Sequence, residues 1–216
     1  MKVSQIYEKY QIMPQLQTHM LRVAGVASVI CDNFSKPIDK ELVVSACLLH
    51  DTGNIVKFKL EKFPEFLKPK GLKYWQKVQN QFIQKYSKDD YKATHKILRE
   101  MKINSSIYLL IKSMEFKNAQ VNSKQSASLE EKVSLYSDSR VAPYGILSLD
   151  ERLREVKERF MKNRGMDERR FNKIASSLRL IEEQVFFMTK LKPDDITERK
   201  VLPQMLKLDN FDIKIG

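Results

Sequence analysis

Apolar residues recur at intervals of three and four over most of the chain, which is the pattern of amphipathic helices. In the segment 14–34, for example, Leu16, Met20, Val23 and Ala27 fall on one helical face. The same spacing predicts helices over residues 39–50, 73–86, 89–101, 105–115, 148–163 and 167–191, and one that starts after Ser128 and carries Asp138. Strand-type alternation is almost absent, so we expect an all-α fold.

Several of these helices begin at residues that can cap a helix N-terminus. Asp39 stands at the start of the helix over 39–50, and Ser128 and Ser148 are each followed three residues later by a glutamate, as in a capping box. Gly53 follows the helix over 39–50, and glycine permits the left-handed turn that often stops a helix. We therefore expect this helix to end just before Gly53.

Three segments lack a sustained period. Residues 54–71 hold two prolines among lysines and phenylalanines, and they are expected to form either a lid that collects phosphate or a solvated connector. Residues 117–126 are rich in Asn, Gln and Ser, which predicts a mobile loop. The tail, residues 194–216, is expected to hold one helical turn near 200–207 and then a loose end.

The length and composition favour one soluble domain with a terminal extension. A chain of 216 residues suffices for one well-buried core and is short for two. There is no apolar run near the roughly 18 residues of a membrane helix and no charged-then-apolar leader, so we expect a cytoplasmic protein without membrane contact. Cys31 and Cys47 have no paired or metal-type spacing and are expected to be reduced core residues.

The charge of the chain is strongly positive. A formal net charge of +12 favours anionic partners such as nucleotides, phosphate esters or nucleic acid. A generally lysine-rich, solvated surface would give the same number, so charge alone leaves both interpretations open.

His50 and Asp51 stand side by side at the end of an apolar helical run. Adjacent side chains on a helix point about 100° apart, so the pair can reach two cis positions, roughly 90° apart, on one octahedral metal ion. A His-Asp pair also arises by chance and is weak evidence alone. His19 lies upstream of the pair and Asp138 downstream, which raises its weight.

The order His19, His50-Asp51, Asp138 resembles the HD-domain superfamily of metal-dependent phosphohydrolases, over the region from residue 19 to about residue 160. Two local details carry the same resemblance. Arg22 follows the first histidine with the family's spacing, and the segment from Ser148 to Leu153 is similar to one that follows the aspartate in small prokaryotic HD proteins. Ser137 departs from those proteins, which have alanine before the aspartate.

The resemblance implies a single HD-type helical bundle. We expect residues 1–163 to form the metal-binding helical domain and residues 164–216 to add a C-terminal long helix and tail that pack on the same domain. The apolar face from Phe171 to Met188 could serve the core or a homodimer equally well.

The resemblance also implies one divalent metal ion, with His19, His50, Asp51 and Asp138 as its ligands. Two nitrogens and two carboxylates leave positions open on a six-coordinate ion for water and a phosphoryl oxygen, and Mn, Co, Ni, Fe or Zn would suit this mixture. Such an ion activates water and neutralises phosphate, so we expect a metal-dependent phosphohydrolase that acts on a phosphorylated, nucleotide-like small molecule, with Asp51 also serving catalysis.

Three further residues are candidates for roles at this site. His95 resembles a position where many family members carry another histidine, and it is expected either to contact phosphate or donate a proton, or to be a simple core histidine. Glu115 either orients the water or is a surface glutamate. Arg22, one turn from His19, either grips phosphate as a bidentate fork or forms an ordinary salt bridge.

In a second hypothesis the protein binds the metal but does not catalyse a reaction. In that case the chain is a non-catalytic HD module that binds a nucleotide or a nucleic acid through its basic surface. The intact set of four ligands favours the enzyme, because a decayed site would be expected to lose at least one of them.

Overall fold

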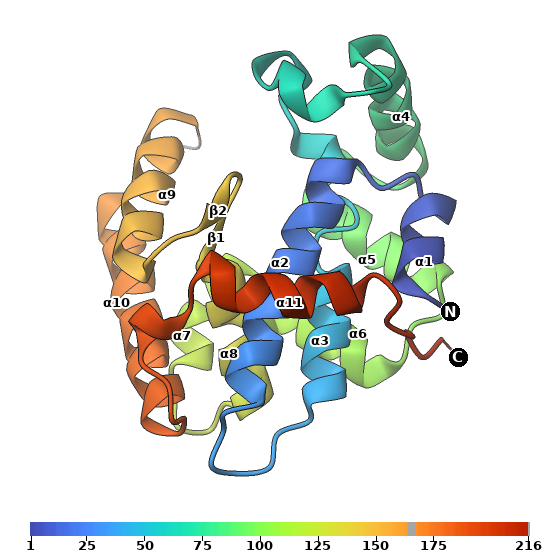
Figure 1. The fold of residues 1–216 in the computed structure, drawn as a ribbon. Helices are drawn as coiled ribbons and strands as arrows, with labels where there is room; N and C mark the ends of the chain where they lie inside the picture. Colours follow the sequence, from blue (N-terminus) through green and yellow to red (C-terminus); the bar gives the residue numbers. More distant parts are fainter. Residues whose placement is uncertain (164–166, 216) are drawn as a thin grey trace.

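The computed structural model describes residues 1–163 and 167–215, with the side chains of residues 160–163 excepted. The described residues form a bundle of helices and one short antiparallel hairpin, so the predicted all-α class is confirmed (Figure 1). Among the described residues, no helix combines the length and the apolarity that crossing a membrane requires.

The α-helices are α1 (Val3–Lys9), α2 (Pro14–Cys31), α3 (Lys40–Leu49), α4 (Leu72–Lys85), α5 (Asp90–Glu100), α6 (Ser105–Ser113), α7 (Ala119–Asn122), α8 (Leu129–Ser139), α9 (Leu149–Asn163), α10 (Glu168–Phe187) and α11 (Glu198–Leu208). Short 3-10 helices are η1 (Asn54–Lys57), η2 (Leu60–Lys62), η3 (Pro64–Leu67), η4 (Phe116–Asn118) and η5 (Pro193–Asp195). The hairpin pairs β1 (Val141–Ala142) with β2 (Gly145–Ile146).

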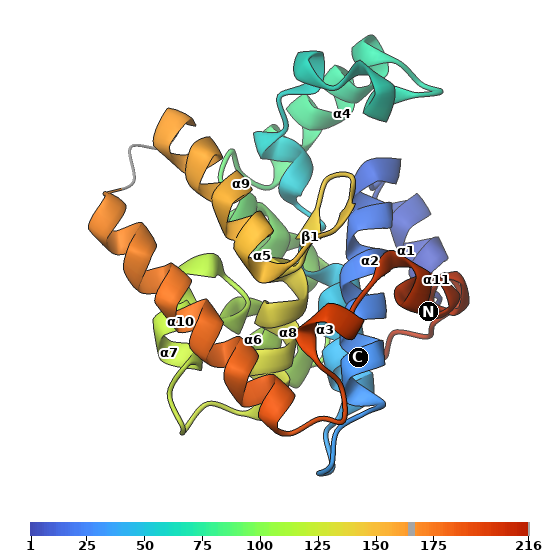
Figure 2. The same ribbon diagram turned by 60° about the vertical axis from the view of Figure 1, so that its left-hand side comes forward.

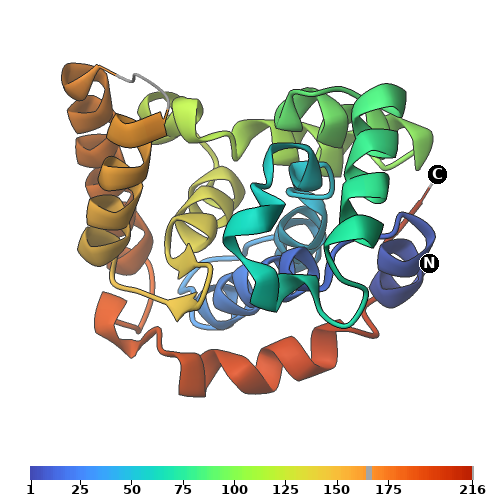
Figure 3. The same ribbon diagram turned by 90° about the horizontal axis from the view of Figure 1, so that it is seen from above.

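Helix α2 lies at the centre of the bundle and packs against α3, α8 and α11 (Figure 3). Its predicted apolar stripe is buried, with Met20, Val23 and Ala27 fully inaccessible. Burying this stripe removes apolar surface from water, which is the main force that holds the helices together. Cys31 and Cys47 are free and buried in the same core, as predicted.

The predicted caps are confirmed. The Asp39 carboxylate accepts a hydrogen bond from the Leu42 amide at 2.9 Å, which satisfies one of the otherwise unpaired donors at the start of α3. Ser128 and Glu131 form a reciprocal capping box at α8. Ser148 and Glu151 do the same before α9.

The helix ends before Gly53, but the predicted left-handed turn at this glycine is wrong. Its φ of −93° and ψ of −4° lie in the right-handed region, so no left-handed turn ends α3. A Cβ at this position would stand 2.4 Å from the Thr94 amide nitrogen of α5, too close for any side chain. Glycine is needed here because the backbone of α5 approaches the chain directly after the His-Asp pair.

Two segments predicted as loops contain more structure than expected. Residues 54–71 fold into η1, η2 and η3 and stand with α4 at one end of the molecule (Figure 1). In the segment 117–126, η4 and α7 replace the predicted mobile loop, since Ala119 and Asn122 are buried and α7 packs on α10. The polar sequence of α7 concealed this tertiary contact.

The tail also differs from the prediction. Helix α11 spans 11 residues rather than one turn, and it packs along α2 with Val201 fully buried. Gly25 of α2 makes this approach possible, because a Cβ there would stand 2.7 Å from a methyl carbon of Val201. The predicted loose end is ordered, since the Ile213 amide donates to the Met1 carbonyl and its side chain is buried.

Helix α10 packs on α7, α8 and α9, and its apolar stripe from Phe171 to Val185 is buried within the chain. The residues from Phe171 to Val185 therefore serve the core, and the possible homodimer stays a prediction. The predicted boundary between residues 163 and 164 stays a prediction, because residues 164–166 lie outside the described residues.

Candidate metal centre

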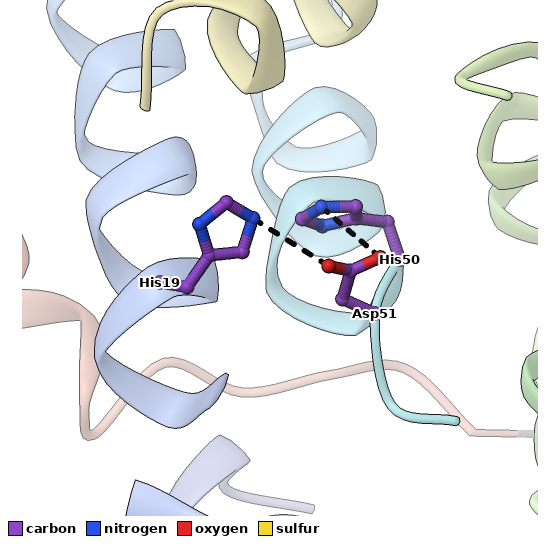
Figure 4. Close-up of side chains that lie close together, drawn as sticks. All are labelled: His19, His50 and Asp51. Carbon is purple, nitrogen blue, oxygen red and sulfur yellow. Dashed lines mark ion pairs between the residues drawn. The ribbon is translucent and has the colours of Figure 1, made fainter. Parts of the chain in front are cut away.

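Side chains from three helices meet at one point beside α2. His19 comes from the first half of α2, His50 caps the C-terminus of α3 and Asp51 follows it, while Asp138 lies in the last turn of α8. Figure 4 shows His19, His50 and Asp51 turned toward one another. Residues separated by up to 119 positions along the chain are thus brought together.

The distances between these side chains are short. Asp138 Oδ1 lies 3.1 Å from His19 Nε2 and 3.3 Å from His50 Nε2. Asp51 reaches both rings from the other side, with Oδ2 at 3.6 Å from His19 Nε2 and Oδ1 at 3.7 Å from His50 Nε2. One ligand atom from each of His19, His50 and Asp51 can be chosen so that the three lie within 4.8 Å of one another, a spacing that could hold a metal ion.

The backbone determines which nitrogen of His50 faces the cluster. His50 Nδ1 is 2.8 Å from the Cys47 carbonyl oxygen, which can only accept, so Nδ1 carries the hydrogen and donates it. In the neutral ring Nε2 then presents a lone pair to the cluster, and this buried atom has no hydrogen-bond donor of its own. Such a second hydrogen bond is the usual way in which a metal-binding histidine is oriented.

The electrostatics of the cluster favour a cation between these groups. Burial lowers the pKa of His50, but the charges of Asp51 and Asp138 outweigh burial and raise it to about 9. Burial likewise opposes ionisation of Asp138, while His50 and His19 hold the pKa of that carboxyl well below its usual range. Without a metal ion, the carboxylates therefore retain a proton on the imidazole.

The four side chains fit the proposed ion by chemistry and by access. They offer two imidazoles and two carboxylates, a mixture suited to divalent transition metals. The exposed fractions are 16% for His19, 21% for Asp51 and 32% for Asp138, so solvent and a substrate can reach them.

His95 makes a separate pair with Glu115. His95 Nε2 lies 3.2 Å from Glu115 Oε1, and the Lys117 ammonium lies 2.5 Å from the other carboxylate oxygen. Glu115 is only 7% exposed, so its interpretation as a surface glutamate is wrong. The buried Nδ1 atom of His95 has no hydrogen-bond partner in the structure.

The sequence did not predict a role for Tyr91, which is influenced by the charges of both histidine clusters. Burial, then the charges of Asp90, Asp51, Asp138 and Glu115, raise the pKa of its hydroxyl, which places Tyr91 in the field of both sites. The Lys117 ammonium stands 5.7 Å from the centre of its ring. Its position four residues before His95, on the same face of α5, is the signal that could have identified it.

The cations near the cluster are engaged elsewhere in this structure. Arg22 Nε donates to Glu198 Oε1 of α11 at 2.9 Å, which is the ordinary salt bridge that was its alternative interpretation. Lys57 pairs with Asp90 at 2.5 Å. Arg140 is buried and donates to the carbonyls of Leu147 and Ile196, so it holds the hairpin and the segment before α11 against α8.

Comparison with families of known proteins matches residues 16–120 to the HD domain. This segment contains His19, His50 and Asp51, and it ends before Asp138. Searches of curated proteins and of solved structures gave no match. The matched segment, the His-Asp pair and the helical fold agree with one another and are consistent with membership of the HD-domain superfamily.

Proposed function

We propose that this protein is a metal-dependent phosphohydrolase that cleaves a phosphomonoester or phosphodiester of a nucleotide-like substrate. The observation that carries the proposal is the orientation of His50, whose Nε2 atom faces two carboxylates and lies beside a second imidazole. The match of residues 16–120 to the HD domain supports the same reaction class. The nucleotide-like nature of the substrate is inferred from the basic charge of the chain.

In this proposal His19, His50, Asp51 and Asp138 hold one divalent ion, which is Mn, Co, Ni, Fe or Zn. When bound, such an ion supplies Lewis acidity and lowers the pKa of a water molecule. Asp51 has a second role, because its two oxygens face different histidines and one of them can accept a hydrogen bond from the attacking water. This contact orients the water toward phosphorus.

His95 contacts the phosphate or donates a proton to the leaving oxygen. The Glu115 carboxylate orients the ring through Nε2, and the buried Nδ1 has no hydrogen-bond partner among the described residues. A carboxylate partner also stabilises the imidazolium that such a donor needs. Arg22 contributes N–H groups other than Nε to a phosphate oxygen, while Glu198 keeps the guanidinium in place.

The test combines metal analysis with a screen for phosphate release. The purified protein, supplied with manganese, cobalt or nickel, is offered nucleotides and a generic aryl phosphate beside His50→Ala. We expect about one metal ion per chain and release of phosphate that the variant lacks. Metal without release on any compound would favour the non-catalytic binding module, and absence of metal would contradict the ligand assignment.

A further inference from the structure

Four aromatic rings contact one another in a row, which we call the aromatic shelf: Phe58, Phe63, Phe66 and Tyr144. Phe63 stacks on Phe66 with ring centres 5.4 Å apart and planes 14° from parallel. Phe58 meets the edge of Phe63 at 6.2 Å, and Tyr144 lies 5.4 Å from Phe66. Tyr144 is 71% exposed although its hydroxyl donates to Glu65 at 2.9 Å.

Two short segments join the shelf to the proposed metal ligands. Phe58 follows Asp51 by seven residues, and Tyr144 follows Asp138 by six. The hairpin turn is fixed to α2, since Gln15 donates to the Pro143 carbonyl at 2.5 Å. Gln15 lies one helical turn before His19, or about 6 Å along the axis. Figure 2 shows the hairpin rising between α9 and α2 toward the segment that carries η1 to η3.

The chain around the shelf is strongly basic. Between residues 57 and 77 there are seven lysines and two glutamates, a net charge of +5, and all seven lysines are exposed. Half-exposed rings surrounded by lysines suit a ligand that has flat bases and many phosphates. An apolar partner would gain from the rings but would bring no negative charge to the lysines, of which Lys57 also pairs with Asp90.

We propose that the aromatic shelf and the lysines of residues 57–77 bind single-stranded nucleic acid and direct one of its phosphoesters to the metal centre. The proposal rests on the proposed function and narrows its substrate from a nucleotide-like molecule to a polymer. A mononucleotide has a single base to stack on the rings and too few phosphates to contact all the lysines. A polymer has enough bases and phosphates for both. Bases stack on the shelf, and phosphates follow the lysines toward His19, Asp51 and Asp138.

The experiment measures binding, so that it does not depend on turnover. Fluorescence anisotropy of the full-length metal-loaded protein is recorded with labelled single strands of about 12 nucleotides, as RNA and as DNA, because binding sites of this kind cover several nucleotides. Tyr144→Leu should weaken binding about tenfold, whereas Tyr144→Phe, which keeps the ring and loses the bond to Glu65, should bind as the wild type does. Phe66→Leu gives a second, independent removal of a ring.

The matched control is Phe187→Leu, which removes an 87% exposed ring at the end of α10 and should leave binding unchanged. The wild type should bind the single strand more tightly than a mononucleotide or a duplex of equal length, and binding should fall steeply with salt. Equal binding of the duplex, or wild-type affinity in both Tyr144→Leu and Phe66→Leu, would overturn the proposal. Phosphate release from the aryl phosphate reports separately on the proposed function, and the RNA and DNA strands show which sugar is accepted.

Discussion

The metal centre and the His95–Glu115 pair both bring imidazole against carboxylate, but they differ in how the negative charge is neutralised. Glu115 has its own cation, because the Lys117 ammonium lies 2.5 Å away. The ion pairs described for Asp51 and Asp138 are all to His19 and His50. The first site could therefore hold a cation from solution, while the carboxylate of the second site is already paired with a lysine.

The largest expected effect on the difference between the two sites comes from removing one carboxylate of the first site. Asp51→Ala should abolish metal retention, from about one ion per chain to none, with unchanged helical content. Metal analysis and circular dichroism measure the two quantities. Asp212→Ala, which removes a well-exposed carboxylate near the C-terminal end, is the control and should keep the metal. Undiminished metal in Asp51→Ala would refute the ligand assignment.

The carboxylates of the first site also predict that the free energy of unfolding of the metal-free protein depends on pH. The folded state raises the pKa of His50 from 6.5 to about 9, so protonation stabilises the fold. This contribution is complete below pH 6.5 and is lost as the pH rises toward 9, and it amounts to about 3 kcal/mol. Denaturant titrations across this range measure the loss, and His50→Gln should show a flatter profile.

The metal should reverse that trend, because it replaces the proton on His50. Its affinity should increase over the same pH range, since the ligand must lose a proton before it binds. Metal affinity that does not change with pH would contradict the assignment of His50 Nε2 to the ion.

The second site can be separated from the first by its own variant. His95→Ala should lower kcat about 100-fold and leave the metal content unchanged, because a positioned proton donor contributes to the reaction and not to metal binding. Steady-state kinetics and metal analysis of the same sample provide the comparison. If His95→Ala lost the metal as Asp51→Ala is expected to, His95 would belong to the metal centre and the two sites would not be separate.

The smallest expected effect concerns Arg22. Arg22→Ala should raise KM about tenfold with the metal retained, since a charged hydrogen bond to phosphate would be lost. Glu198→Gln keeps the arginine and removes its partner, so its KM should stay closer to that of the wild type. An unaltered KM in Arg22→Ala would show that Arg22 does not contact phosphate and only forms the salt bridge with Glu198.

Features encoded within a few residues were predictable from the sequence. The stripe of α2, the Asp39 cap and the Ser128–Glu131 box depend on neighbours three or four positions away. The His-Asp pair was identified for the same reason.

Features that depend on distant segments were not predictable in this way. The pair of Arg22 with Glu198 joins residues 176 positions apart, and α11 packs on α2 where Gly25 leaves room for Val201. Gly53 appeared to be a helix stop, although its actual function is to admit the backbone of α5. Tyr91 carried no motif and was found only through its surroundings.

The contact at Gly53 has a mechanical consequence. Its amide donates to Thr94 Oγ1 at 3.0 Å, two residues after Asp51 and one residue before His95. Helix α5 therefore cannot shift without pulling on the backbone that carries a proposed metal ligand. The Gly53 amide is buried in this joint, so the rate at which its hydrogen exchanges with deuterium reports directly how often α5 separates from the chain that carries Asp51.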